Sequence, residues 1–174
     1  MISGSSSQNA CRARIGWHTA LDSNGIRLWS MLKSLSITGY LAMVGGLVAL
    51  LAMRSLFSLS PLVILVQAAA LLLFLWARVT FGRRSFHVRA DPTEGGLVTA
   101  GPYRYIRHPI YSAMCLMIWA GVIAHWSWRA AFCGVVVLGG AVVRIFCEEK
   151  LVAARYPEYG QYAATTWRMI PYVF

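Results

Sequence analysis

Four long apolar segments limit what this chain of 174 residues can fold into. They cover residues 35–53, 61–77, 110–125 and 130–147. The chain is 58% hydrophobic and 13% charged, whereas soluble domains contain about 25% charged residues. A straight helix needs about 20 predominantly apolar residues to cross a bilayer. The composition and the segment lengths therefore predict an integral membrane protein.

Backbone amides in hydrocarbon must be hydrogen-bonded within the segment, so the apolar segments are expected to be helices. The first segment is long enough to span, and the second is long enough if it begins near Leu56. The third and fourth are short and are separated only by residues 125–129, with Trp126 and Trp128 suited to the membrane interface. We therefore predict an all-α fold with about four transmembrane helices, the last two forming a tight hairpin. A re-entrant hairpin that does not fully cross is the alternative.

The basic residues are distributed asymmetrically along the chain. Lys and Arg number 16 against six Asp and Glu, for a net charge of +10. They gather in the N-terminal flank, in residues 78–108 and in the C-terminal tail, whereas the two short opposite loops hold only Arg54 and Arg129. Four crossings place every basic-rich segment on one side, which should be cytoplasmic. We therefore expect a protein of the cell inner membrane with both termini in the cytoplasm. We expect no nucleic-acid partner, because no nucleic-acid-binding motif accompanies the positive charge.

The polar and proline-containing segments outside the apolar runs divide the chain into an N-terminal tail and one domain. Residues 1–30 are expected to form a polar tail without the apolar core of a signal peptide. The four cysteines form no C-x-x-C pair, so neither a disulfide nor a metal site is predicted. Residues 91–96 are typical of a turn in a binding loop. Pro157 should end the last long helix, with a short cytoplasmic helix following over residues 159–166.

Two polar signatures flank the predicted hairpin. The first runs Gly101-Pro102-Tyr103-Arg104-Tyr105-Ile106-Arg107-His108-Pro109-Ile110-Tyr111, and the second runs Arg144-Ile145-Phe146-Cys147-Glu148-Glu149-Lys150-Leu151. If the hairpin crosses the membrane and returns, both signatures end on the same face. Two of the six acidic residues then lie opposite an Arg-His-Pro sequence, which indicates a candidate site.

Each signature has a structural interpretation as well as a functional one. Arg144 lies four residues before Glu148, so an ordinary ion pair on one helix face is possible, with Glu149 facing solvent. Charged groups near membrane depth, however, usually pair or line a cavity. Pro109 should hold His108 in an extended conformation at a helix mouth, where anions bind well. Tyr111 lies one turn further on and could face the same cavity, and the alternative is that both side chains merely anchor the helix at the membrane interface.

Together, the two signatures resemble those of the isoprenylcysteine carboxyl methyltransferase family and the related phospholipid methyltransferases. The likeness covers roughly residues 75–174 and includes the closing Trp167-Arg168-Met169-Ile170-Pro171. It implies a membrane methyltransferase domain over residues 31–174, with a part of about residues 80–174 that binds S-adenosylmethionine. The implied cofactor-binding residues are Tyr105, Arg107, His108, Pro109, Tyr111, Glu148 and Glu149. A G-x-G element described for some phospholipid methyltransferases is not evident, and Gly95-Gly96 is an imperfect substitute.

The resemblance also implies the type of reaction. Methyl transfer to a lipid-like or small apolar acceptor is expected, with a carboxylate favoured and Arg155 and Glu149 as catalytic residues. A guanidinium can bind a carboxylate through two parallel hydrogen bonds, and Arg155 fits this role better than Arg168. One alternative is an NADPH-dependent membrane reductase of the sterol-reductase type, which shares a similar end region. The other is a non-catalytic membrane protein, and the oligomeric state is left open.

Overall fold

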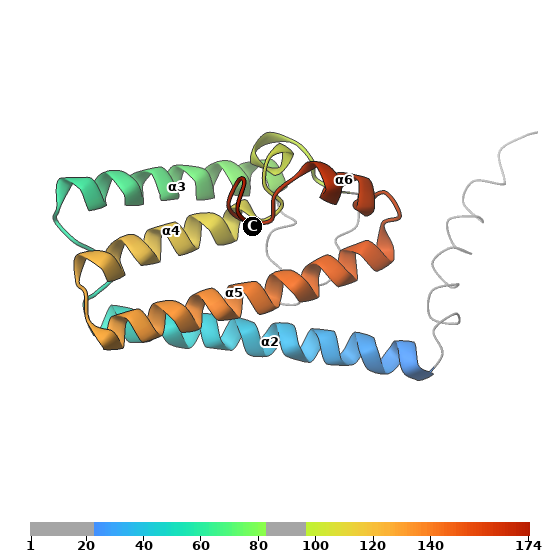
Figure 1. The fold of residues 1–174 in the computed structure, drawn as a ribbon, viewed down its shortest axis with the longest axis horizontal. Coiled ribbons are helices and arrows are strands. Elements are labelled where there is room, and N and C mark those ends of the chain that lie inside the picture. Colours follow the sequence, from blue (N-terminus) through green and yellow to red (C-terminus); the bar gives the residue numbers. More distant parts are fainter. Residues whose placement is uncertain (1–22, 83–96) are drawn as a thin grey trace, which may run out of the picture.

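The computed structural model describes residues 23–82 and 97–174, and these residues form helices without any β-strand (Figure 1). This confirms the all-α fold predicted from the apolar segments. The elements are α2 (Ser23–Ala52), α3 (Pro61–Phe81), the 3-10 turn η2 (Gly101–Arg104), α4 (Pro109–Ala124), α5 (Trp128–Arg155) and α6 (Tyr159–Thr165).

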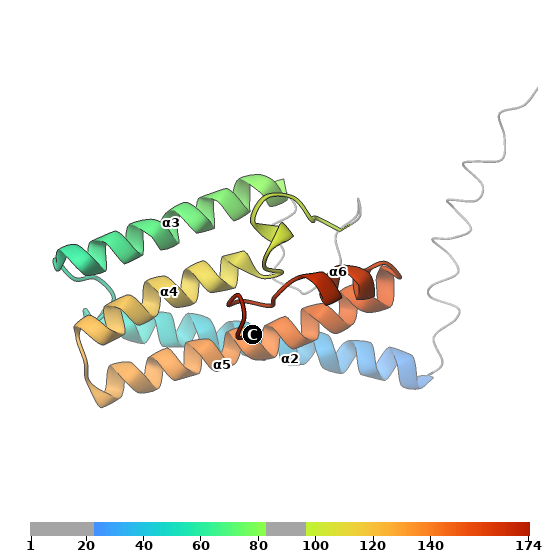
Figure 2. The same cartoon turned by 45° about the horizontal axis from the view of Figure 1, so that its top comes forward.

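The four long helices run alternately in opposite directions (Figures 1 and 2). Helix α2 packs along α5, α5 along α4, and α4 along α3. The start of α4, the end of α5 and helix α6 therefore meet at one end of the bundle. Both polar signatures lie at this end, as the hairpin interpretation predicts.

Three of the helices are long and apolar enough to cross a membrane: Arg27–Ala52 within α2, all of α3, and all of α5. Helix α4 is also apolar but has only 16 residues, which makes it about 24 Å long, against about 30 Å of bilayer hydrocarbon. Helix α3 turns large apolar side chains outward, Leu62, Leu72 and Val79 among them, as expected of a surface that faces lipid. The protein is thus an all-α membrane protein with a short fourth apolar helix.

Helices α2 and α5 come close together because glycines meet at their contact. A Cβ atom on Gly39 would lie 2.9 Å from the carbonyl oxygen of Gly140, and one on Gly46 would lie 2.6 Å from Val137. Small residues at such positions let helix backbones approach within a membrane. Gly45 on α2 and Gly139 on α5 make no such contact, because a Cβ on either one would meet only open space.

Helices α3 and α4 are joined through the loop that precedes α3. The Gln67 side chain on α3 donates hydrogen bonds to the carbonyl oxygens of Leu56 (2.7 Å) and Met117 (3.3 Å). This pairing satisfies an amide that would be costly to bury alone. Gly121 on α4 packs directly on the Leu56 carbonyl, since a Cβ there would lie 2.1 Å from its oxygen.

The boundaries differ in part from those expected. Helix α2 begins at Ser23, inside the range 1–30 assigned to the polar tail, so the helix extends beyond its apolar run. Helix α5 ends at Arg155, just before Pro157, and α6 over Tyr159–Thr165 matches the predicted short helix. The expected turn at residues 91–96 lies outside the described residues.

Candidate active site

Glu149 on α5 is the centre of the polar end of the bundle. Its Oε1 atom lies 2.8 Å from Nε of Arg107 and 3.3 Å from Nε2 of His108, and its Oε2 atom lies 3.0 Å from Nε of Arg168. Only 11% of the Glu149 side chain is exposed. The structural interpretation of the second signature, in which Glu149 faces solvent, is therefore wrong. Glu149 instead joins the start of α4 to the segment after α6.

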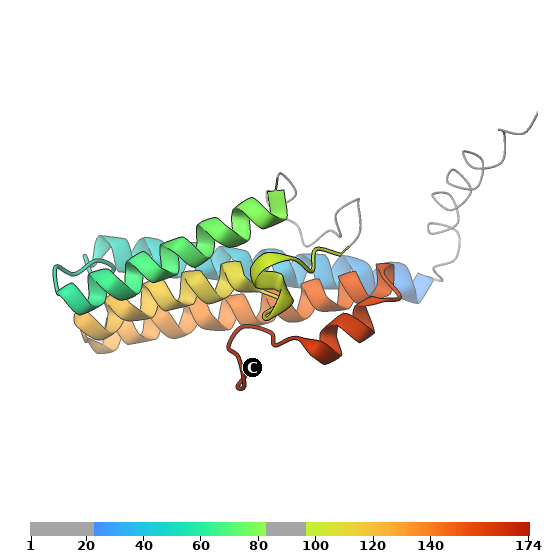
Figure 3. The same ribbon diagram turned by 90° about the horizontal axis from the view of Figure 1, so that it is seen from above.

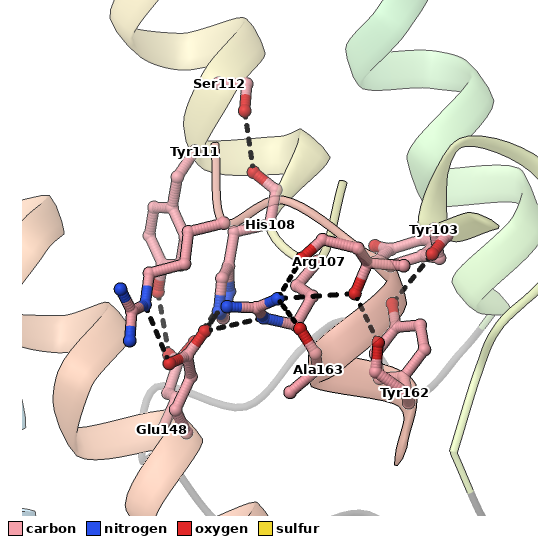
Figure 4. Close-up of polar contacts among 11 residues, drawn as sticks. Tyr103, Arg107, His108, Tyr111, Ser112, Glu148, Tyr162 and Ala163 are labelled. Atoms are coloured by element: carbon pink, nitrogen blue, oxygen red, sulfur yellow. Dashed lines mark hydrogen bonds and ion pairs between the residues drawn. The ribbon is translucent and has the colours of Figure 1, made fainter. Parts of the chain in front are cut away.

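Glu148 has a separate set of partners. Its Oε1 atom accepts a hydrogen bond of 2.7 Å from the Tyr111 hydroxyl and lies 3.0 Å from Nε of Arg144, one turn back on α5. Arg144 also donates to the Tyr111 hydroxyl at 2.5 Å. The predicted Arg144–Glu148 pair is thus present, but Tyr111 extends it across to α4 (Figure 4).

Arg107 ties α6 to the site. Its Nη1 group donates to the carbonyl oxygen of Ala163 at 2.9 Å and to both the carbonyl and the hydroxyl oxygen of Thr166 (Figure 4). Its side chain is 7% exposed. A buried guanidinium is tolerated only when it is paired, and here Glu149 engages Nε while Ala163 and Thr166 engage Nη1.

His108 is held at the entry of α4 by its neighbour. Pro109 is buried and occupies the first turn of the helix, where its missing N–H costs nothing. His108 itself has φ −125° and ψ 57°, so its backbone is outside the helical region but is not extended as predicted. Its Nδ1 atom lies 3.9 Å from Oε2 of Glu148, so the ring stands between the two carboxylates.

A group of tyrosines borders the cluster on the α6 side. The Tyr162 hydroxyl donates to the carbonyl oxygen of Tyr103 at 2.8 Å (Figure 4). Burial raises the pKa of Tyr162 to about 12. The pKa of Tyr159 is also raised, mainly by burial and to a lesser extent by the negative charge of Glu149. These hydroxyls therefore remain protonated donors throughout the physiological range of pH.

The structure brings together most of the predicted site residues. Arg107, His108, Tyr111, Glu148 and Glu149 form one contiguous cluster, and Pro109 supports it through the backbone. Two predicted residues lie apart from it. Tyr105 is 61% exposed, and its carbonyl oxygen accepts a hydrogen bond from the Trp167 amide. Arg155 is exposed at the end of α5 and makes no hydrogen bond or ion pair with either carboxylate.

Several residues of the cluster were not predicted from the sequence. Tyr40 on α2 places its ring 5.3 Å from the Arg144 guanidinium, and the backbone of Ala163 and Thr166 holds Arg107. Nothing in the local sequence marks these residues. Arg168 does carry a signal, because it belongs to the closing motif of the resemblance, and the structure places it on Glu149, with its guanidinium 5.1 Å and 5.2 Å from the ring centroids of Phe146 and Phe174.

The cluster combines three guanidinium groups with two carboxylates. S-adenosylmethionine carries both an ammonium and a carboxylate on its methionyl end, and the cluster offers complementary charges to each. Arg168 is the most exposed of the three arginines, with 36% of its side chain accessible against 7% for Arg107 and 6% for Arg144. The charged groups would therefore suit a ligand of this kind, and Arg168 is the arginine best placed to exchange one partner for another.

The comparison with protein families identifies the wider group. The family model described as phospholipid methyltransferase matches residues 62–159, more than half of the chain. The chain belongs to the phospholipid methyltransferase family. The matched region runs from α3 to the start of α6 and includes both polar signatures, whereas α2 and Arg168 lie outside it. No curated protein and no solved structure matches the chain. Its membership and its apolar helices make this protein a membrane methyltransferase in general terms.

Proposed function

We propose that this protein transfers the methyl group of S-adenosylmethionine to a lipid-like or small apolar acceptor, with a carboxylate favoured. The observation that carries the proposal is the position of Glu149, which is buried and shared by Arg107, His108 and Arg168. An ordinary helix-end glutamate would need none of these partners. Their convergence from α4, α5 and the C-terminal segment indicates a built binding site.

Each residue of the cluster has a role in this proposal. Glu149 and Glu148 would accept hydrogen bonds from the methionyl ammonium or from the ribose hydroxyls. Arg107, Arg168 and His108, at the mouth of α4, would hold the methionyl carboxylate. S-adenosylmethionine supplies an activated methyl group on a sulfonium. The protein then needs to align the acceptor with that methyl group and exclude water.

The contacts that Glu148 and Glu149 make with guanidinium groups bear on which chemical group accepts the methyl. Glu148 and Glu149 are both engaged by guanidinium groups, so neither carboxylate is left free to take a proton from an acceptor. A carboxylate acceptor is already ionised at neutral pH and needs no general base, whereas an ammonium group must first lose a proton. The site therefore favours O-methylation of a carboxylate. We also propose that Arg155 orients that acceptor, a role supported by its place two helical turns beyond Glu148 on the same face of α5.

The basic asymmetry supports placing the site at the cytoplasmic side of the cell inner membrane, with both termini on that side. An apolar acceptor would reach the site laterally from the bilayer.

Calorimetry on the purified protein tests the proposal directly. S-adenosylmethionine should bind and NADPH should not, and the Glu149→Gln variant should bind S-adenosylmethionine about ten- to hundredfold more weakly. Binding of NADPH alone would support the reductase alternative, and binding of neither by the wild type would support a non-catalytic protein. Incubation of the protein with methyl-labelled cofactor and a lipid extract should then label an apolar product that releases methanol on mild alkaline hydrolysis, as a methyl ester does.

A further inference from the structure

The chain after α6 forms a segment that lies against the start of α4. We call residues 166–174 the C-terminal strap. The Trp167 amide donates to the Tyr105 carbonyl (3.0 Å), the Arg107 amide to the Trp167 carbonyl (2.7 Å), and the His108 amide to the Arg168 carbonyl (2.9 Å). The Ser112 hydroxyl also donates to the Met169 carbonyl at 2.7 Å. The strap thereby satisfies amides at the helix entry that would otherwise lack partners.

These contacts fix the depth of the strap relative to the membrane. After Ser112 helix α4 contains only apolar residues, so we place the residues just before Pro109 at the boundary between hydrocarbon and headgroups. The strap is paired with those residues and lies at the same level. In Figure 3 the chain after α6 runs back from the end of α5 toward the start of α4 and lies outside the row of four long helices.

The side chains of the strap divide into an inner and an outer set. Arg168 contacts Glu149, and Met169 is 4% exposed. The outer set consists of apolar and aromatic residues whose exposed fractions are 42%, 53%, 86% and 75% for Trp167, Ile170, Tyr172 and Val173. Contiguous apolar exposure of this kind marks a contact surface.

The strap ends in a turn that holds the outer set together. The amides of Met169 and Ile170 donate to the Phe174 carbonyl, and the Phe174 amide donates back to Ile170. Tyr172 adopts φ 65° in this turn, a conformation that is strained for a tyrosine. Its ring lies 5.5 Å from that of Trp167. The turn therefore keeps two amphipathic rings adjacent on the outer side.

We propose that the C-terminal strap is an interfacial membrane anchor, with Trp167, Ile170, Tyr172 and Val173 inserted at the headgroup boundary of the bilayer that the helices cross. Trp and Tyr favour this boundary because each ring has an apolar body and a polar group. The surface is continuous with the start of α4, which already lies at that depth. The same contact holds Arg168 against Glu149, so bilayer attachment and the assembly of the site are coupled.

Fluorescence quenching tests the anchor independently of any activity. The contribution of Trp167 is the difference between the wild type and Trp167→Phe in phosphatidylcholine vesicles. It should be quenched strongly by lipids brominated near the headgroup, less by lipids brominated near the chain end, and little by aqueous iodide. Strong quenching by iodide without quenching by brominated lipid would overturn the proposal. It would place the outer set in water.

Paired charge substitutions test the coupling, which rests on the proposed function. Ile170→Asp with Val173→Asp should lower the affinity for S-adenosylmethionine about tenfold, since Arg168 loses its position. The matched control, Gln161→Asp with Ala164→Asp, adds the same charges on the exposed side of α6 and should bind as the wild type does. Equal affinities for the two double variants would overturn the coupling. A wild type that binds no cofactor would contradict the proposed function, while the quenching result would still decide the anchor.

Discussion

The Nε atom of Arg107 lies 2.8 Å from Oε1 of Glu149, across 42 residues of chain, and the two side chains are 7% and 11% exposed. This ion pair joins the start of α4 to the last turns of α5. Removing one partner of a buried pair leaves the other charge uncompensated, at a cost of about 3–5 kcal/mol. The pair therefore contributes to the assembly of the hairpin as well as to the proposed binding of the cofactor.

Glu149→Gln preserves the size of the side chain but removes its charge. We expect the affinity for S-adenosylmethionine to fall by about ten- to hundredfold, because a charged hydrogen-bond partner contributes about 1.5–3 kcal/mol. His108→Ala should act in the same direction. Titration calorimetry gives the affinities, and circular dichroism checks that the helices persist.

Glu158→Gln is the matched control for charge, because Glu158 is exposed at the start of α6. Its affinity should equal that of the wild type. Unchanged binding by both Glu149→Gln and His108→Ala would show that the two signatures are structural in this protein.

Tyr111→Phe removes the hydroxyl that bridges Glu148 and Arg144. The direct contact of 3.0 Å between those two residues remains, so the loss should be smaller than for Glu149→Gln, about tenfold in cofactor affinity. Tyr105→Phe makes the same chemical change on an exposed ring and should have no effect. Equal losses in the two variants would argue against a specific role for the Tyr111 hydroxyl.

Much of this arrangement follows from local sequence, and some of it does not. The apolar runs predict the helices, and Pro109 and Pro157 predict the entry of α4 and the end of α5. Once residues 110–147 form a hairpin, Arg107 and Glu149, which flank it, are brought to the same end of the bundle. In contrast, the position of Arg168 depends on how the chain folds back after α6, and that of Tyr40 depends on the packing of α2. Neither carries a periodic signal, because each is set by tertiary contacts.

Gly121→Ala tests the close contact between α4 and the loop before α3. A Cβ atom there would lie 2.1 Å from the Leu56 carbonyl oxygen, so the backbone must move apart, at a cost of about 1–3 kcal/mol. We expect a lower melting temperature in detergent. Gly139→Ala is the control, since its Cβ meets open space and alanine favours a helix by up to about 1 kcal/mol. A neutral Gly121→Ala variant would show that the loop is not packed on α4.

The orientation in the membrane is open to chemical labelling. With four crossings and the basic segments inside, cysteines placed near residue 5 and after Phe174 should be protected from an impermeant reagent in intact cells. A cysteine at Ser127, in the loop between α4 and α5, should react. If α4 fails to cross because of its 16 residues, the ends of the chain would be labelled from opposite sides.

Two arginines have competing roles that kinetics can separate. Arg168 contacts Glu149, whereas Arg155 is exposed and contacts neither carboxylate. Arg168→Gln should therefore lower both cofactor affinity and turnover. Arg155→Ala should leave cofactor affinity unchanged, and with an anionic acceptor it should lower turnover strongly, which is the pattern of a residue that orients the acceptor. Arg155→Lys should restore turnover poorly, because an ammonium lacks the paired donors of a guanidinium. Turnover and affinity measured on the same preparation distinguish the two roles. A silent Arg155→Ala variant would argue against a carboxylate acceptor held at the end of α5, and a loss of cofactor binding in that variant would place Arg155 in the cofactor site.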